Sequence, residues 1–258
     1  MNELAEFSTL TIALIALLFF ILALTYSSVG LGGGSSYTAS MVVLGFSAQV
    51  IPFISLSLNI LVTSLSSYQF IRNGHASWRL LLPFLLSSMP MAYLGGALQL
   101  PVAVFQWLLF ISLLFAALRL YFWDRVSLQW QLSRHNRITV SLLAGSVLGL
   151  IAGIVGIGGG IYLVPLILIL GLGTAKQAAA CGAVFVWLNS VVGLLSRVQH
   201  NYVDMSPYLP LLLAVIAGAA LGSWLGAVRL SAKTVEKVLG LVITLAVLML
   251  ANKLIFVR

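Results

Sequence analysis

The sequence has little charge. Only 7% of its 258 residues are Asp, Glu, Lys or Arg, whereas an average soluble domain carries about 25%. Hydrophobic residues make up 61% of the chain, so a soluble fold of this size would lack the polar side chains needed to cover its surface. This shortage excludes a cytosolic globular enzyme, a nucleic-acid-binding protein and a disordered chain, and it leaves a polytopic membrane protein.

Cysteine, acidic residues and catalytic motifs are also scarce. The single cysteine, Cys181, excludes an intramolecular disulfide framework and a multi-cysteine metal cluster, and we expect it to be a buried packing residue. None of the five acidic residues lies in the middle of an apolar segment, which disfavours a cation pump built on buried carboxylates. No Ser/His/Asp set, HExxH motif or P-loop is present, so we expect no enzyme, no cofactor and no metal.

Long apolar segments fall into two groups of five. The first group lies at about 8–28, 34–46, 49–71, 78–98 and 101–122. After a polar loop at 123–137, the second group lies at about 138–155, 159–172, 176–197, 206–227 and 234–256. Apolar segments in lipid must form helices, because every backbone polar group needs an internal partner. The sequence therefore predicts an all-α polytopic membrane protein.

The two groups resemble each other in sequence. Residues 29–34 (VGLGGG) align with residues 155–160 (VGIGGG), and Gly45 aligns with Gly171 at the same offset. We therefore predict a first transmembrane repeat at 1–122, a connecting loop at 123–137 and a second repeat at 138–258. If all five segments cross, the second repeat is inverted relative to the first.

The second segment of each repeat follows a glycine-rich break and is short. About 13 residues of helix span only about 20 Å, less than a bilayer core of about 30 Å, so both segments are predicted half-helices. Eight full spans with two re-entrant segments are the alternative topology.

Thirteen basic residues give the chain a net charge of +8, and they are spread over several short loops. In a membrane protein such residues mark the inner face. With the N-terminus outside, the loop of Arg72 and Arg79 and the central loop lie inside, as the rule requires, whereas Arg197 falls outside, against it. We expect an integral protein of a bacterial inner membrane with its N-terminus outside.

The two glycine clusters are the strongest functional feature. Glycine permits unwound backbone, and the start of a helix offers unpaired N–H groups and a dipole that attract anions. We predict a substrate site near the midplane at Gly30, Gly32, Gly33, Gly34, Ser35, Ser36, Gly156, Gly158, Gly159, Gly160 and Ile161. Close helix packing is the alternative, and we expect it for the pairs Gly149/Gly153 and Gly222/Gly226.

Polar residues inside spans are costly in hydrocarbon and usually face a bundle interior or a cavity. We predict that Asn59 and Asn189 contact the substrate, with interhelical hydrogen bonding as the alternative. His75 and His200 lie at equivalent turns of the two halves, where they are candidates for proton coupling. An ordinary loop histidine is the alternative for both.

The chain resembles the TauE/SafE family of membrane transporters, the sulfite exporter-like permeases. The resemblance is carried by residues 156–160 (GIGGG) followed by Val164 and Pro165, by the turn at 74–79 (GHASWR) and by the helix that begins near Pro210. It covers nearly the whole chain and implies export of a small sulfur-containing anion, such as sulfite or a sulfonate. Ala39 stands where the second half has Pro165, which leaves open whether the two halves contribute equally.

Together these features predict a secondary transporter that works by alternating access. The alternatives are an anion-selective channel, a permease for another small anion and a non-transporting assembly subunit. The expected partners are a small anionic substrate, the lipid bilayer and a second copy in a homodimer, with no nucleic acid.

Overall fold

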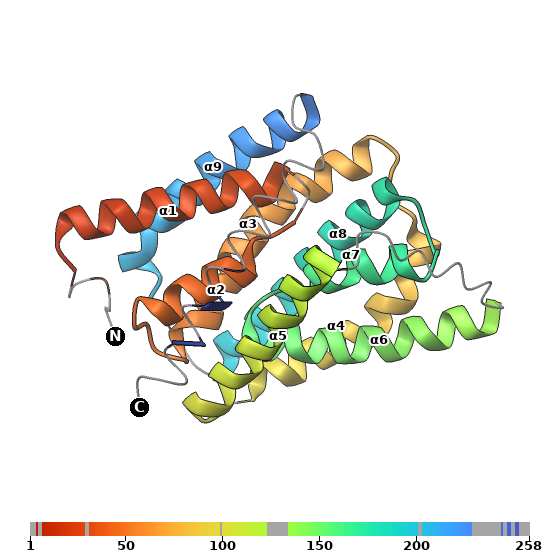
Figure 1. The fold of residues 1–258 in the computed structure, drawn as a ribbon, viewed down its shortest axis with the longest axis horizontal. Coiled ribbons are helices and arrows are strands. Elements are labelled where there is room, and N and C mark those ends of the chain that lie inside the picture. Colours follow the sequence, from red (N-terminus) through yellow and green to blue (C-terminus); the bar gives the residue numbers. More distant parts are fainter. Residues whose placement is uncertain are drawn as a thin grey trace.

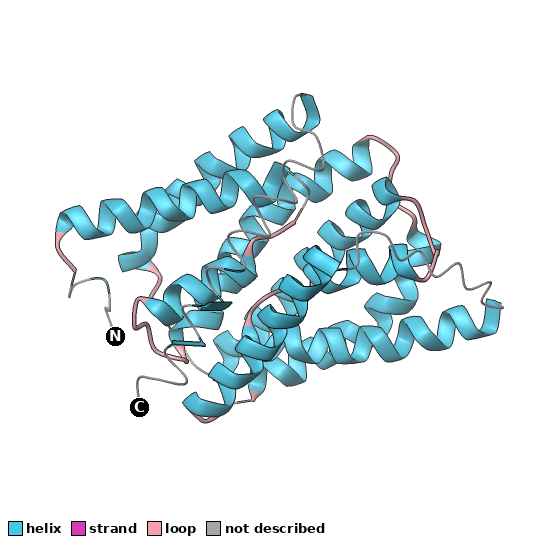
Figure 2. Ribbon diagram, in the orientation of Figure 1, coloured by secondary structure: helices cyan, strands magenta, loops and turns pink. Residues whose placement is uncertain are grey.

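The computed structural model describes residues 4, 7–28, 31–98, 100–122, 134–200, 203–228, 244, 247, 248, 251 and 252. These residues form nine α-helices and one short 3-10 helix, and no β-strand occurs among them (Figure 2). The prediction of an all-α fold is confirmed. The predicted segment at 234–256 falls almost entirely outside the described residues, as does most of the loop at 123–137.

The helices follow the predicted apolar segments closely. The first half contains α1 (Thr9–Ser28), α2 (Gly34–Val43), α3 (Val50–Arg72), α4 (Trp78–Ala97) and α5 (Val102–Phe122). The second half contains α6 (Arg134–Val155), α7 (Gly160–Ile169), α8 (Ala175–His200), the 3-10 helix η2 (Ser206–Tyr208) and α9 (Leu209–Val228). Six described segments are long and apolar enough to cross a membrane: Thr9–Ser28, Val50–Arg72, Trp78–Ala97, Asn136–Val155, Lys176–His200 and Ser206–Ser223.

Two helices extend beyond their predicted ends. α6 begins at Arg134, inside the predicted polar loop, and α8 continues through Arg197 to His200. Hydrophobicity marks only the part of a helix that lies in hydrocarbon, whereas backbone hydrogen bonding continues through polar residues at the interface. Because α8 continues to His200, Arg197, the last residue of the predicted segment, lies inside the helix rather than at its end.

The helices pack in pairs drawn from the two halves. α1 lies along α9, α4 lies along α6, and α3 lies along α8 in the middle of the molecule (Figure 1). Glycines make the outer pairs close: a Cβ at Gly149 or Gly153 of α6 would overlap a carbonyl of α4, and one at Gly222 of α9 would overlap the carbonyl of Leu24. The packing role predicted for these glycines is confirmed, while the contacts of Gly226 lie outside the described part.

The helix directions define two ends of the bundle. Phe7, before α1, stacks on Phe46, before α3, with ring centroids 6.1 Å apart, and Phe46 lies 6.3 Å from Tyr208, before α9. We call this the N-terminal end, where α1, α3 and α9 begin. α4 begins at the opposite end after a short turn, and Ser77 there accepts a hydrogen bond from Cys181 of α8. α6 runs alongside α4 in the same direction, because Gly145, Gly149 and Gly153 meet Phe84, Ser88 and Ala92 in turn.

Candidate functional site

The two short helices begin in the same way. Gly33 precedes α2 with φ +79°, and Gly159 precedes α7 with φ +80°. Both values lie in the left-handed region, which L-residues with a side chain rarely adopt. α2 and α7 are each ten residues long, and Gly34 and Gly160 are their first residues. Gly30, which we also assigned to the site, lies outside the described residues.

The two glycine segments meet at Asn59 of α3. A Cβ built on Gly32 would lie 2.6 Å from Asn59 Oδ1, and one on Gly158 would lie 3.0 Å from Asn59 Nδ2. A Cβ on Gly34 would lie 2.7 Å from the carbonyl oxygen of Ile157, so the segments also approach each other directly. The structure thus brings Asn59 together with predicted glycines of both halves.

Hydrogen bonds from α3 hold the second segment in place. Asn59 Nδ2 donates to the carbonyl oxygen of Gly156 at 3.3 Å, and Ser55 Oγ donates to the same oxygen at 2.8 Å. Thr38 of α2 donates to Ser55 Oγ at 2.9 Å, and the Gly34 carbonyl lies 3.2 Å from that oxygen. Ser55 therefore links the start of α2 to the break before α7, although sequence analysis did not select it. Its spacing of four residues before Asn59, on the same helix face, is the signal that could have found it.

On α8, the side chain that packs against the glycine segments is Val186 rather than Asn189. A Cβ on Gly158 would lie 2.6 Å from Val186 Cγ1, and one on Gly32 would lie 2.9 Å from it. Asn189 is buried and donates to the carbonyl oxygen of Phe185 in its own helix at 2.9 Å. Ser190 lies closer to the break, 3.2 Å from the Cβ position of Gly158. α3 and α8 therefore present different side chains to the centre.

The centre holds buried polar atoms without partners. Asn59 Oδ1, Asn189 Oδ1 and Ser190 Oγ are inaccessible to solvent and have no hydrogen-bond partner among the described residues. Leaving such a group unpaired costs about 1–3 kcal/mol. The first N–H groups of α2 and α7 also have no acceptor within their own helices. The two Oδ1 atoms are acceptors, whereas Ser190 Oγ, the second N–H of each amide nitrogen and the helix N-termini can donate, so this combination can bind a small ligand with oxygen acceptors.

The remaining predicted residues flank this centre. Ser35 and Ser36 are buried, and both pair with the hydroxyl of Tyr26 on α1, at 2.9 and 2.7 Å. Ile161 is also buried. Tyr26 was missed by sequence analysis, because nothing in its spacing shows that α1 lies against the start of α2.

The two histidines lie at the ends of helices, and the structure does not bring them to the centre. His75 follows α3 and packs edge-on against Phe70, with ring centroids 6.4 Å apart. His200 is the last residue of α8, and its Nδ1 lies 2.7 Å from the carbonyl oxygen of Ser196.

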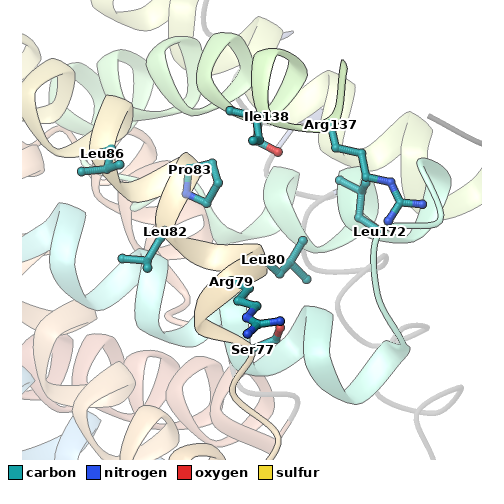
Figure 3. Close-up of a pocket in the computed structure, with 10 residues that line it drawn as sticks. Ser77, Arg79, Leu80, Leu82, Pro83, Leu86, Arg137, Ile138 and Leu172 are labelled. Carbon is teal, nitrogen blue, oxygen red and sulfur yellow. The ribbon is translucent and has the colours of Figure 1, made fainter. Parts of the chain in front are cut away.

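Two pockets lie near opposite ends of the bundle, and each contains arginine. A pocket of about 790 Å³ at the opposite end is lined by Arg79 and Arg137, with Leu82, Pro83 and Leu86 further along α4 (Figure 3). A pocket of about 450 Å³ at the N-terminal end is lined by Gln49, Leu98, Ile154 and Arg197 among others. Sequence analysis counted Arg197 only as a basic residue on the outer side, against the positive-inside rule, and did not predict that its side chain is buried within α8.

Comparison with known proteins gives consistent matches. A family model described as "Sulfite exporter TauE/SafE" matches residues 15–250. The "Probable membrane transporter protein y4hK" of Sinorhizobium fredii is 33% identical over 232 residues, covering 89% of this chain and 94% of that protein. A "Probable membrane transporter protein" of Xylella fastidiosa is 25% identical over 227 residues, covering 83% of this chain and 85% of that protein. The "Probable membrane transporter protein YunE" of Bacillus subtilis is 30% identical over 110 residues, covering 42% of this chain and 39% of that protein. No solved structure matches the chain.

Proposed function

The chain belongs to the sulfite exporter TauE/SafE family of membrane transporters, and from this membership we propose that it carries a small sulfur-containing oxyanion such as sulfite or a sulfonate. One observation supports an oxyanion most directly. Two helices begin at left-handed glycines on either side of Asn59, in a centre where the hydroxyl of Ser190 has no hydrogen-bond partner among the described residues. An oxyanion would accept hydrogen bonds there from backbone N–H groups, from the amide of Asn59 and from the hydroxyl of Ser190.

Burial of this centre favours a carrier over a channel. Asn59, Asn189 and Ser190 are fully buried, so the described residues leave no water-filled path through them. A carrier that works by alternating access closes around its substrate and opens to one side at a time, so a buried centre fits one of its closed states. A conducting channel instead keeps a continuous pore.

The inverted arrangement of two repeats would allow the motion that alternating access requires. α1 and α6, the first helices of the two predicted repeats, run in opposite directions, and each packs against the fourth helix of the other half. We propose that the two halves rock about the central pair α3 and α8, so that the glycine segments face first one side and then the other.

We propose export as the direction of transport, because the matching family is described as a sulfite exporter family. The basic residues indicate only how the protein is oriented in the membrane. Arg72, Arg79, Arg137 and Lys176 all lie at the opposite end of the bundle, which the positive-inside rule places in the cytoplasm. The N-terminal end then faces outward from a bacterial inner membrane.

Replacing Asn59 with leucine tests the proposal. The two side chains have similar sizes, and an apolar group removes the unpaired Oδ1, so the protein should fold with little change in melting temperature. Ser55 still holds the Gly156 carbonyl. We expect saturable sulfite uptake into proteoliposomes, driven by a counter-ion gradient, to fall at least about tenfold, which corresponds to the loss of one hydrogen bond to a charged ligand.

The matched control is Asn73→Leu, the same substitution at the exposed end of the same helix. It should transport like the wild type. Unchanged uptake by Asn59→Leu would show that this centre does not bind the transported anion. Single-channel currents from the wild-type protein in planar bilayers would show that it is a channel and not a carrier.

A further inference from the structure

A buried arginine near the N-terminal end has no carboxylate partner among the described residues. Arg197 is only 7% exposed, and its Nη2 donates to the carbonyl oxygens of Gly153 and Ile154 at 2.8 and 2.7 Å. Its Nε is buried and has no acceptor among the described residues. Asp204 is the one carboxylate that the described residues contain, and it accepts hydrogen bonds from Ser206.

The carbonyl groups compensate the charge only in part. Gly153 and Ile154 are at the end of α6, where the helix dipole is negative, so a cation is stabilised there. A guanidinium group has five N–H donors, however, and the contacts just described use two of them. A full positive charge buried in an apolar protein interior is costly unless an anion neutralises it.

Arg197 also faces empty space. It lines the pocket of about 450 Å³ together with Gln49 before α3, Leu98 after α4 and Pro101 before α5. At about 30 Å³ per water, this volume has room for a small hydrated oxyanion. The pocket lies at the N-terminal end, and its wall at Ile154 is two residues before Gly156, where the central glycine segment begins.

We infer that this pocket is a second anion site, at which a small oxyanion pairs with Arg197 on its way between the central site and the N-terminal end of the protein. The inference deepens the proposed function and rests on it. The ligand class follows from the arginine, because guanidinium binds the oxygens of carboxylates, sulfonates and sulfur oxyanions through charge-assisted hydrogen bonds.

The test is sulfite transport in proteoliposomes of known protein orientation, with the half-saturating concentration measured from each side. For Arg197→Gln we expect a rise of about tenfold or more when sulfite is presented at the N-terminal end, and no change from the opposite side. Arg79→Gln is the matched control, since Arg79 lines the pocket at the other end, and it should leave the N-terminal value unchanged.

A second substitution distinguishes lost anion binding from the loss of the hydrogen bonds that Arg197 donates to the end of α6. Leu98 is half exposed at the pocket wall, so Leu98→Asp adds a negative charge that repels anions without removing the arginine. It should raise the same half-saturating concentration. If both variants keep the wild-type value and Arg197→Gln only loses maximal rate and melting temperature, Arg197 is a helix cap and the inference is overturned.

Equilibrium binding separates this inference from the proposed function. If the wild-type protein transports no sulfite, the proposed function fails, and sulfite binding to purified protein still tests the pocket. Binding that survives Asn59→Leu and is lost in Arg197→Gln supports the second site. Equal binding by the wild type and Arg197→Gln overturns it.

Discussion

Replacing Gly158 with alanine separates a binding role of the glycine segments from a purely conformational one. Gly158 has φ +79°, where a side chain costs about 1–2 kcal/mol. The added Cβ would also lie 2.6 Å from Val186 Cγ1, 3.0 Å from Asn59 Nδ2 and 3.2 Å from Ser190 Oγ. Carbon contacts below 3.0 Å force the neighbours to move, so a single methyl group disturbs the polar side chains that we propose bind the anion.

Gly45→Ala provides the comparison. Gly45 has φ +89°, so its backbone cost is similar, but an added Cβ meets nothing within 4 Å. We expect both variants to lose about 1–2 kcal/mol of unfolding free energy from the backbone, and Gly158→Ala to lose about 1–3 kcal/mol more from overpacking. Because Asn59 and Ser190 shift only in Gly158→Ala, that variant alone should lose sulfite flux, at least about tenfold.

The assay is sulfite uptake into proteoliposomes that contain equal amounts of folded protein, with melting temperatures measured in parallel. Because each flux is divided by the amount of folded protein, a variant that is merely less stable does not appear slower. Equal flux in the two alanine variants would refute the argument, because it would show that these glycines serve only the backbone conformation and the packing.

Two further predictions concern stability. Gly149→Val should separate α4 from α6, because its side chain would overlap the carbonyl of Ser88, and we expect the unfolding free energy to fall by about 1–3 kcal/mol or more. The control is Val147→Ala on the exposed face of α6, which should have little effect in the same thermal unfolding experiment. Asp204 accepts hydrogen bonds from the N–H and hydroxyl of Ser206, which lower the pKa of its carboxyl group, so its stabilising effect should be present above the unfolded pKa near 4 and be lost as the pH falls through the folded value. The melting temperature of the wild type should therefore exceed that of Asp204→Asn at pH 7 and match it in strong acid, whereas a pH-independent difference would contradict this account.

Hydrophobicity predicted the helices well because lipid leaves an apolar segment no other stable backbone conformation. The short helices α2 and α7 were predicted at the right places because glycine clusters and limited length are both visible in sequence. The ends of α6 and α8 were missed by a few residues, since polar residues continue a helix beyond the hydrocarbon.

The side-chain contacts at the centre were harder to predict. The bond from Ser55 to Gly156 joins residues 101 positions apart, and no local pattern encodes it. Asn59 and Asn189 resemble each other in kind, but helix rotation places Val186 against the glycines and turns Asn189 toward its own backbone. The burial of Arg197 likewise depends on where α6 ends, which the sequence of α8 does not contain.

The pairing of α1 with α9 and of α4 with α6 has a consequence for biosynthesis. About 180 residues separate the end of α1 from the start of α9, so at about 5–20 residues per second roughly 10–35 s pass before the partner of α1 is made. During this time the α1 backbone that Gly218 and Gly222 will cover faces lipid or a chaperone. The proposed anion site is likewise incomplete when its first half is made, since Gly156 is synthesised 101 residues after Ser55. A chain truncated after the fifth helix should therefore insert into the membrane but remain a loose set of helices, open to proteolysis until the second half closes over it.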